Sequence, residues 1–338
     1  TRPSIQEISR LTGVSKATVD RVLNNRAGVQ AHTRLHVMSM LDRFAGSQVQ
    51  DKEATIPSRQ LDFIIPDHDN AFLGEMATYA ERCADENAGL NITIHRPASA
   101  RESDILQTLN GIMATTDALG IVGLDSHKLR ECIRSLEDRD IPVVTLASDI
   151  RNAPRTAYVG IDNHAAGRLA GFLAGRMIAN PLGRTALILG SRAYFGHEER
   201  ELGYRSVMRD QYPKMRIVDE REIHENTDTA YRETRKILDQ HSDLDGIYCI
   251  GAGQRGVAQA LIDAGRAGSV LFIAHGLSND TRRWLEDSVL DVIIDESASS
   301  EAQAAVDTLV ARLDNSPALS RQAIPIVPIF RENLPVTS

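Results

Sequence analysis

Apolar residues follow two different periods along this chain. From Leu61 onward, short continuous apolar runs alternate with longer segments in which apolar residues recur every three or four positions. The short runs are typical of buried strands, and the periodic segments are typical of amphipathic helices. The first candidate strand is Leu61–Ile65 and the last is Ile324–Ile329. Because strand and helix alternate almost without exception, the pattern predicts an α/β fold with parallel sheets, divided between two lobes of about five or six strands each.

The first residues of the chain follow a purely helical pattern. Ile5, Ile8 and Leu11 have the spacing of one helix face, and Thr12-Gly13 supplies a stop and a tight turn. Ser15 is then a good N-cap for a second helix, and a third periodic run comes after it. This order predicts a helix-turn-helix, while a small helical bundle without DNA function is the alternative.

The second helix of this unit has an apolar face and a polar face. Its predicted buried residues are Val19, Val22 and Leu23. Lys16, Ala17 and Arg21 remain near its start and on its outer face, where a recognition helix would meet base edges. Residues 1–46 hold seven Lys and Arg against three Asp and Glu, whereas the whole chain has a net charge of −8. A basic head on an acidic body fits local binding of phosphates.

A polar stretch without apolar periodicity separates the helical head from the α/β body, and it predicts a linker. The predicted organisation is a DNA-binding head at 1–46, a linker or hinge at 47–60, a first lobe at 61–161 plus 292–322, and a second lobe at 162–291 plus 323–338. In such folds ligands bind beyond the carboxyl ends of the strands, so the loops that follow the strands are the candidate site.

Composition limits the class of protein without naming a function. The 42% hydrophobic content is ordinary for a globular chain. No apolar run reaches about 18 residues and no leader precedes the first helix, so we expect a cytoplasmic protein without a membrane partner. Cys83, Cys132 and Cys249 are isolated and lack the spacing of metal ligands, which indicates reduced structural residues.

Four stretches together carry a resemblance to a known family. The head reads Gly13-Val14-Ser15-Lys16-Ala17-Thr18-Val19-Asp20-Arg21-Val22-Leu23-Asn24, and the body holds Asp69-Asn70-Ala71-Phe72, Val159 to Gly167, and Arg200 to Tyr204 in order. This combination resembles the lactose repressor (LacI/GalR) family over nearly the whole chain. The resemblance implies a helix-turn-helix head joined to a two-lobed core of the periplasmic-binding-protein type I, similar to ribose-binding proteins.

The resemblance also implies roles for residues of the head. Lys16, Ala17 and Arg21 match positions that read bases: arginine can form two bonds to guanine, lysine can donate to guanine, and a methyl group can touch thymine. The candidates for phosphate contacts are Ser15, Thr18, Asn24, Asn25, His32 and Thr33. Phosphate contacts fix the register on DNA without reading its sequence.

In the core, the resemblance implies a sugar-binding cleft between the lobes. Arg200 matches an arginine that grips ring oxygens or hydroxyls, Asn70 matches a hydrogen-bonding position, and Phe72 is either a stacking residue or plain core. The candidate ligand-binding residues are Asp69, Asn70, Phe72, Asp125, Ser148, Asp149, Arg200, His275 and Glu296. His275 and Glu296 stand where the family has other polar groups, so an ordinary free aldose is a less secure ligand.

Two stretches suggest chemistry and are weighed against simpler interpretations. Asp67-His68-Asp69 resembles a metal or acid–base cluster, but adjacent residues on an extended loop point in different directions. Gly251 to Gly256 matches a dinucleotide fingerprint, yet no acidic residue ends the next strand, so a tight strand-to-helix turn is the simpler interpretation. We therefore expect no catalytic residues, no metal and no cofactor.

The sequence predicts a ligand-responsive DNA-binding transcription regulator, most often a repressor in this family. Its expected partners are operator DNA, a sugar, polyol or related effector, and a second copy in a homodimer, because one head offers too few contacts for specific affinity. Two alternatives stay open: a solute-binding protein without DNA function, and a nucleotide-binding enzyme.

Overall fold

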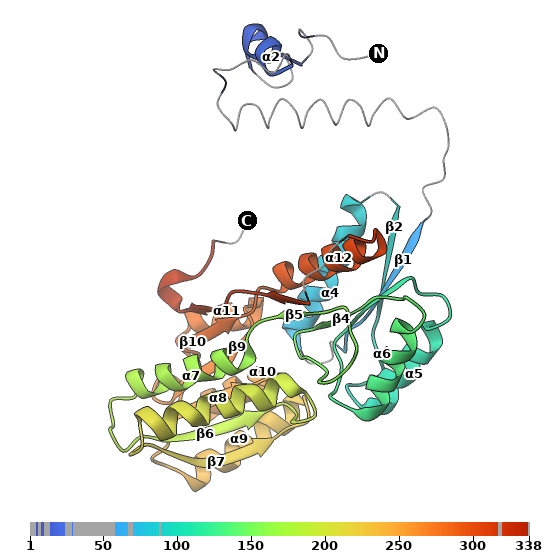
Figure 1. The fold of residues 1–338 in the computed structure, drawn as a ribbon. Helices are drawn as coiled ribbons and strands as arrows, with labels where there is room; N and C mark the ends of the chain where they lie inside the picture. Colours follow the sequence, from blue (N-terminus) through green and yellow to red (C-terminus); the bar gives the residue numbers. More distant parts are fainter. Residues whose placement is uncertain are drawn as a thin grey trace. The chain divides into compact units, whose positions relative to one another are not determined.

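The computed structural model describes two compact units, residues Thr1–Pro57 and Ser58–Ser338, which we treat separately (Figure 1). The described residues are 5, 8–9, 14–23, 29, 58–66, 70–87, 89–316 and 320–336.

The first unit contains helix α2 (Lys16–Leu23), the predicted second helix of the head. Its start is capped as predicted, because the side-chain oxygen of Ser15 accepts from the backbone N–H of Thr18 at 3.3 Å. Val19 and Val22 are buried and cluster with Ile8. Leu23 was also expected to be buried, but it is 40% exposed. The apolar stripe on the described part of this helix is therefore narrower than the sequence indicated.

The second unit begins with a first lobe built on a six-stranded parallel sheet, in the order β11-β5-β4-β3-β1-β2. Its strands are β1 (Arg59–Ile64), β2 (Leu90–His95), β3 (Ala118–Ile121), β4 (Val143–Leu146), β5 (Ala157–Gly160) and β11 (Arg321–Ala323). The helices that pack on this sheet are α4 (Ala71–Glu86), α5 (Glu102–Ile112), α6 (His127–Glu137) and α12 (Ala298–Leu313). Figure 1 shows α12 alongside α4.

The second lobe has another six-stranded sheet, in the order β12-β10-β9-β8-β6-β7. Its strands are β6 (Arg184–Leu189), β7 (Arg216–Glu222), β8 (Gly246–Ile250), β9 (Leu271–His275), β10 (Val292–Asp295) and β12 (Val327–Ile329). Its helices are α7 (Asn163–Met177), α8 (Phe195–Gln211), α9 (Thr227–Gln240), α10 (Gln254–Asp263), α11 (Asn279–Glu286) and the 3-10 turn η1 (Arg331–Asn333). All pairs are parallel except β10 with β12.

The two-lobed α/β fold is confirmed, but two details of the sequence-based assignment are wrong. Residues 292–322 were assigned to the first lobe, whereas β10 (Val292–Asp295) pairs with β9 in the second sheet. The run Ile324–Ile329 was expected to be one strand, but only Val327–Ile329 of it forms a strand, β12, which pairs with β10, and β11 ends before the run and pairs with β5. Pro325 and Pro328 lack a backbone N–H, which disfavours one continuous strand here. In the described residues from 89 to 336, the chain therefore crosses between the sheets after β5, β10 and β11.

Helices α7 and α8 touch through their backbones. A Cβ atom added to Gly167 would lie 2.0 Å from the carbonyl oxygen of Arg200. One added to Gly203 would lie 2.2 Å from the carbonyl oxygen of His164. Glycine at both positions lets the helices approach more closely than any side chain would allow. The approach sets Arg200 of α8 beside Asn163, the first residue of α7.

Among the described residues, none of the helices combines the length and the apolar character needed to cross a membrane.

We expect Gly167→Ala to lower the free energy of unfolding by about 1–3 kcal/mol, because the new methyl group must push α7 away from α8. Urea unfolding followed by circular dichroism, which reports on the helices of both lobes, measures this change. The matched control is Gly111→Ala on α5, where an added Cβ meets nothing within 4 Å. This control should raise the free energy of unfolding by about 0.5–1 kcal/mol. Equal gains for both variants would contradict the close backbone contact.

Candidate functional site

The head presents the predicted DNA-reading residues to solvent. Lys16, Ala17 and Arg21 are exposed on α2, opposite the buried Val19 and Val22. Ser15 is also exposed, and it forms the cap of the helix together with Thr18. The other predicted phosphate contacts, Asn24, Asn25, His32 and Thr33, lie outside the described residues.

A cavity of about 50 Å³ lies between the two lobes, beyond the carboxyl ends of their strands. This volume has room for only a few water molecules. Its lining comes from both lobes: Pro66, Asn70, Phe72, Leu73, Val122, Ala147 and Ser148 from the first, Tyr194, Gly196, His197, Arg200, Glu225, Gly251, Gln254 and His275 from the second, and Glu296 from the crossing after β10. Parallel strands of two lobes thus converge on one site, as this class of fold predicts.

Arg200 is the centre of a buried polar network at this site. Its Nε donates to Asn163 Oδ1 at 2.6 Å, and its Nη2 donates to Glu296 Oε2 at 2.5 Å. The side chains of Arg200 and Glu296 are 5% and 4% exposed. Burial opposes ionisation of Glu296, but the charge of Arg200 outweighs it and holds the pKa of that carboxyl at about 2. Arg200 and Glu296 therefore form a buried ion pair across physiological pH.

His275 continues this network toward the second sheet. The hydroxyl of Tyr248 lies 2.7 Å from His275 Nε2, and His275 Nδ1 lies 3.4 Å from Glu296 Oε1. Among the described residues, that Nδ1 has no hydrogen-bond partner of good geometry. Burial, with the nearby charge of Arg200, lowers the pKa of His275 to about 4. The imidazole is therefore neutral at neutral pH and adds no positive charge to the cavity.

His197 and Glu225 form a second buried pair on the cavity wall, which the sequence analysis missed. Glu225 Oε1 lies 3.6 Å from His197 Nδ1. Burial, followed by the charge of Arg200, lowers the pKa of His197 to about 3, whereas burial raises the pKa of Glu225 to about 7. Glu225 lies in the loop after β7, which ends at Glu222, and the sequence analysis named no candidate from that loop. Its position in a loop that follows a strand of the parallel sheet is the signal that would have identified it.

Six of the predicted ligand-binding residues line the cavity: Asn70, Phe72, Ser148, Arg200, His275 and Glu296. Asn70 also caps α4, because its Oδ1 accepts from the N–H of Leu73 at 3.2 Å. Phe72 is only 9% exposed, so it belongs both to the core of the first lobe and to the cavity wall. Ser148 Oγ accepts from the N–H of Gly196 at 3.0 Å, which links the two lobes.

Asp125 and Asp149 do not belong to the described residues that line the cavity, contrary to prediction. Asp125 pairs with Arg130 at 2.6 Å and with Arg151 at 2.7 Å. Asp149 pairs with Arg155 and accepts from Thr145 Oγ1. Arginines of the first lobe thus form ion pairs with both carboxylates. The remaining candidate, Asp69, lies outside the described residues, as does all of Asp67–Asp69.

The Gly251–Gly256 stretch forms a tight turn between β8 and α10. Gly251 and Gly253 have φ angles of 96° and 95°, in the left-handed region that favours glycine. A Cβ added to Gly256 would lie 2.2 Å from the carbonyl oxygen of Thr227, so this glycine permits close packing of α10 on α9. The tight turn and the packing of α10 on α9 therefore account for these glycines without a bound nucleotide. Within the described part of the chain, no group of three or more candidate metal ligands comes together.

Comparison with known proteins gives two family matches. Residues 61–317 match the periplasmic binding protein domain, and residues 4–45 match the lacI family of bacterial regulatory proteins. The chain is 26% identical to the HTH-type transcriptional regulator DegA of Bacillus subtilis, over 62% of this chain and 61% of DegA. It is also 26% identical to the regulator MalR of Clostridium butyricum, over 78% of each. The match therefore spans about three fifths of DegA and about four fifths of MalR.

Solved structures share the fold of the core. GanP, a glucose-galactose binding protein from Geobacillus stearothermophilus, matches with a TM-score of 0.76 and 23% identity over 82% of this chain and 99% of that protein. A solute-binding protein from Burkholderia graminis in complex with D-arabinose matches with a TM-score of 0.76 and 21% identity over 82% and 97%. At these identities the likeness establishes the fold alone. The chain belongs to the periplasmic binding protein domain family through its core, residues 61–317, and its residues 4–45 are a lacI-family helix-turn-helix head of the kind found in bacterial regulatory proteins.

Proposed function

We propose that this chain is a repressor that binds operator DNA as a homodimer in the cytoplasm and responds to a sugar, a polyol or a related small molecule bound between its lobes. The observation that carries the proposal is a cavity lined by buried polar side chains of both lobes, in a chain whose head exposes Lys16 and Arg21. A homodimer is proposed because one head offers too few contacts for specific affinity, and two heads read a pseudo-palindromic site.

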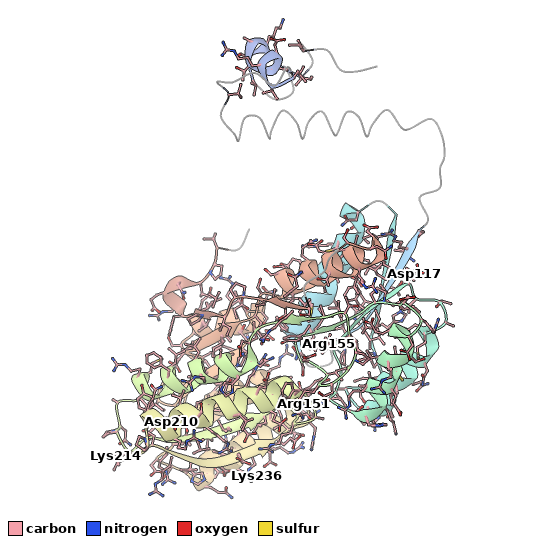
Figure 2. The ribbon with its side chains drawn as sticks, in the orientation of Figure 1. Asp117, Arg151, Arg155, Asp210, Lys214 and Lys236 are labelled. Atoms are coloured by element: carbon pink, nitrogen blue, oxygen red, sulfur yellow. The ribbon has the colours of Figure 1, made fainter. Side chains whose placement is uncertain are left out.

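Direct contacts between the lobes support a response to ligand. The N–H of Asp125 donates to the carbonyl oxygen of Ala193 at 2.8 Å. The guanidinium of Arg151, labelled in Figure 2, lies 4.3 Å from the centre of the Phe195 ring of α8 and 3.5 Å from Glu198. These contacts stabilise the closed arrangement of the lobes. A ligand changes the balance between closed and open forms only if it binds one of them more tightly.

The small volume of the cavity limits how a ligand can enter it. Sites for small ligands usually measure about 300–1,000 Å³, several times more than the 50 Å³ between these lobes. We infer that a sugar ring enters while the lobes stand further apart, or that the Arg200–Glu296 pair rearranges to admit it. Binding is therefore coupled to a change of conformation, which is what a ligand-responsive regulator requires.

The proposed class of effector rests on the fold and on the names of similar proteins. Structures with the same fold are described as binding glucose and galactose or D-arabinose, and one similar regulator is the ribose operon repressor of Halalkalibacterium halodurans. Polyhydroxylated ligands fit a cavity in which hydrogen-bonding side chains such as Asn70, Arg200 and Gln254 line the wall beside Phe72.

The second candidate function is that of a solute-binding protein in transport, and the solved structures that share the core fold favour it. Enrichment of DNA from a random pool, at low salt and with the full chain, separates the two. A regulator should enrich a pseudo-palindromic sequence, whereas a transport protein should enrich none.

For the DNA contact, we expect Arg21→Ala to weaken binding to the selected operator by about 1–3 kcal/mol and to relax the preference at one base pair of each half-site. Gel-shift titrations against the operator and its single-base variants measure both effects. Arg283→Ala, at an exposed position on α11 of the core, is the control and should leave operator affinity unchanged. Equal loss on operator and random DNA would reassign Arg21 to phosphate binding.

For the cavity, the test removes both members of the buried ion pair. Arg200→Ala alone leaves the buried Glu296 charge unpaired, at a cost to stability of about 3–5 kcal/mol. The double variant Arg200→Met with Glu296→Gln avoids this cost, so we expect it to fold and to bind the operator. It should lose both the ligand-induced thermal shift and the ligand response in the gel shift.

The control for this experiment is Arg209→Ala, an exposed position on the same helix α8. It should keep the thermal shift produced by an effective sugar, because ligand that binds only the folded state stabilises it by mass action. Unchanged ligand response in the double variant would remove Arg200 from the site.

A further inference from the structure

The carboxyl group of Glu225 is a buried acceptor on the cavity wall. Its Oε2 accepts from the N–H of Ala252 at 3.2 Å. Its Oε1 is buried and has no hydrogen-bond partner among the described residues. The side chain is 10% exposed and lines the cavity. Burial of a carboxyl oxygen without a hydrogen-bond donor costs free energy. One further donor beside Glu225 Oε1 would therefore stabilise the site.

The surrounding backbone is built around this carboxyl group. A Cβ added to Gly190 would lie 1.7 Å from Glu225 Oε1, and one added to Gly251 would lie 3.1 Å from it. Both positions therefore leave room for the carboxyl at the ends of β6 and β8. Glu225 and the preceding His224 have φ angles of 58° and 51°, which side chains rarely adopt. Backbone strain of this kind costs free energy and clusters at functional sites, so it supports a functional role for Glu225.

Among the described residues that line the cavity, Glu225 is the acid that no positively charged side chain pairs with. Arg200 is paired with Glu296 at 2.5 Å. Burial first, and the charge of Arg200 second, lowers the pKa of both His197 and His275. Both rings are therefore neutral at neutral pH. An anionic group placed beside Glu225 would meet a like charge, whereas a hydroxyl or an ammonium group would supply the missing donor.

Glu225 also borders a larger space outside the cavity. A pocket of about 550 Å³ shares Tyr194 and Glu225 with the inner cavity. Its other walls include Ser99 and Arg101 of the first lobe and His224 of the second. Among the described residues, Glu225 therefore lines both spaces, whereas Arg200 lines the inner cavity alone.

We propose that Glu225 selects the effector of this chain by accepting a hydrogen bond from a hydroxyl or amino group, so that the cleft takes neutral or amino sugars and rejects sugar acids and sugar phosphates. This inference rests on the proposed function, because it assumes that the effector binds between the lobes. It deepens that function by naming the class of effector and the residue that chooses it.

The test compares matched ligands on the full chain by isothermal titration calorimetry. The probes are D-glucose, D-galactose and D-mannose, each with its 2-amino, uronic acid and 6-phosphate forms. We expect the neutral or amino form of at least one sugar to bind at least about tenfold more tightly than its acid and phosphate forms, because like charges oppose each other in the cavity. Equal or tighter binding of an acid or a phosphate would overturn the inference.

The decisive variant is Glu225→Gln, which keeps the size of the side chain and removes its charge. It should reduce the preference for the neutral or amino form over the acid form at least about fivefold, because the repulsion of the acid is gone. Glu286→Gln, at an exposed position on α11, is the control and should keep the wild-type preference. The same preference in Glu225→Gln and in the wild type would overturn the inference.

A pH series supplies a readout that a purely structural role would not change. His197 and Arg200 of α8, Tyr194 before that helix, and Cys249 of β8 face the Glu225 carboxyl. His224 precedes it on its own loop, Glu222 is the last residue of the preceding strand β7, and Arg101 and Glu102 line the outer pocket with it. Burial raises the pKa of Glu225 to about 7, and the nearby Arg200 limits that rise.

Since an ionised carboxylate accepts more strongly than a carboxylic acid, the affinity for a neutral sugar should rise about fivefold from about pH 6 to about pH 8. Glu225→Gln should remove the rise, while Glu286→Gln should keep it. A rise that persists in Glu225→Gln would assign the titration to another group and overturn the inference.

The outcomes separate this inference from the proposed function. Binding of a sugar that changes operator affinity, with a preference that Glu225→Gln does not alter, overturns the role of Glu225 and leaves the regulator standing. If no probe binds and none changes operator affinity, both this inference and the proposed class of effector are overturned.

Discussion

Close backbone contact between α7 and α8 is the constraint on which the cleft depends. Gly167 and Gly203 let each helix reach the other's carbonyl oxygens, and this approach sets Arg200 within 2.6 Å of Asn163. A bulkier residue at either glycine would move the guanidinium away from Asn163 and from Glu296. The polar chemistry of the cavity is therefore decided by small residues that never touch it, as is usual where a rigid scaffold positions a functional side chain.

The buried acids of the core are of two kinds, according to whether Arg200 forms an ion pair with them. Glu296 pairs with Arg200 and stays ionised, because the ion pair outweighs the cost of burial. Among the described residues, neither Glu225 nor Glu301 has such a partner, and burial raises the pKa of both. Since Arg200 is already committed to Glu296, a ligand that reaches this arginine must compete with an internal carboxylate. Affinity then depends on what the ligand offers to both members of the pair.

The sequence predicted the architecture better than it predicted the cleft. Alternating apolar runs were enough for two lobes with parallel sheets, because burial on both faces of a strand leaves a clear local signal. The motif around Arg200 likewise placed that residue at the site. Periodicity could not assign β10 to its sheet, since pairing depends on contacts far apart in the chain. Nor could it show that arginines neutralise Asp125, or that an extension of β7 carries Glu225 to the cavity.

The partners of Arg200 also connect the cavity to the movement of the lobes. Asn163 begins α7 directly after the chain crosses over from β5, and Glu296 lies directly after β10, where the chain crosses back toward α12. The guanidinium therefore joins two of the connections between the lobes in the described part of the chain. On the proposed function, a ligand that draws Arg200 away from either partner would act on these connecting segments. Binding in the cavity would then change the lobe angle directly, without the need for a longer path through the core.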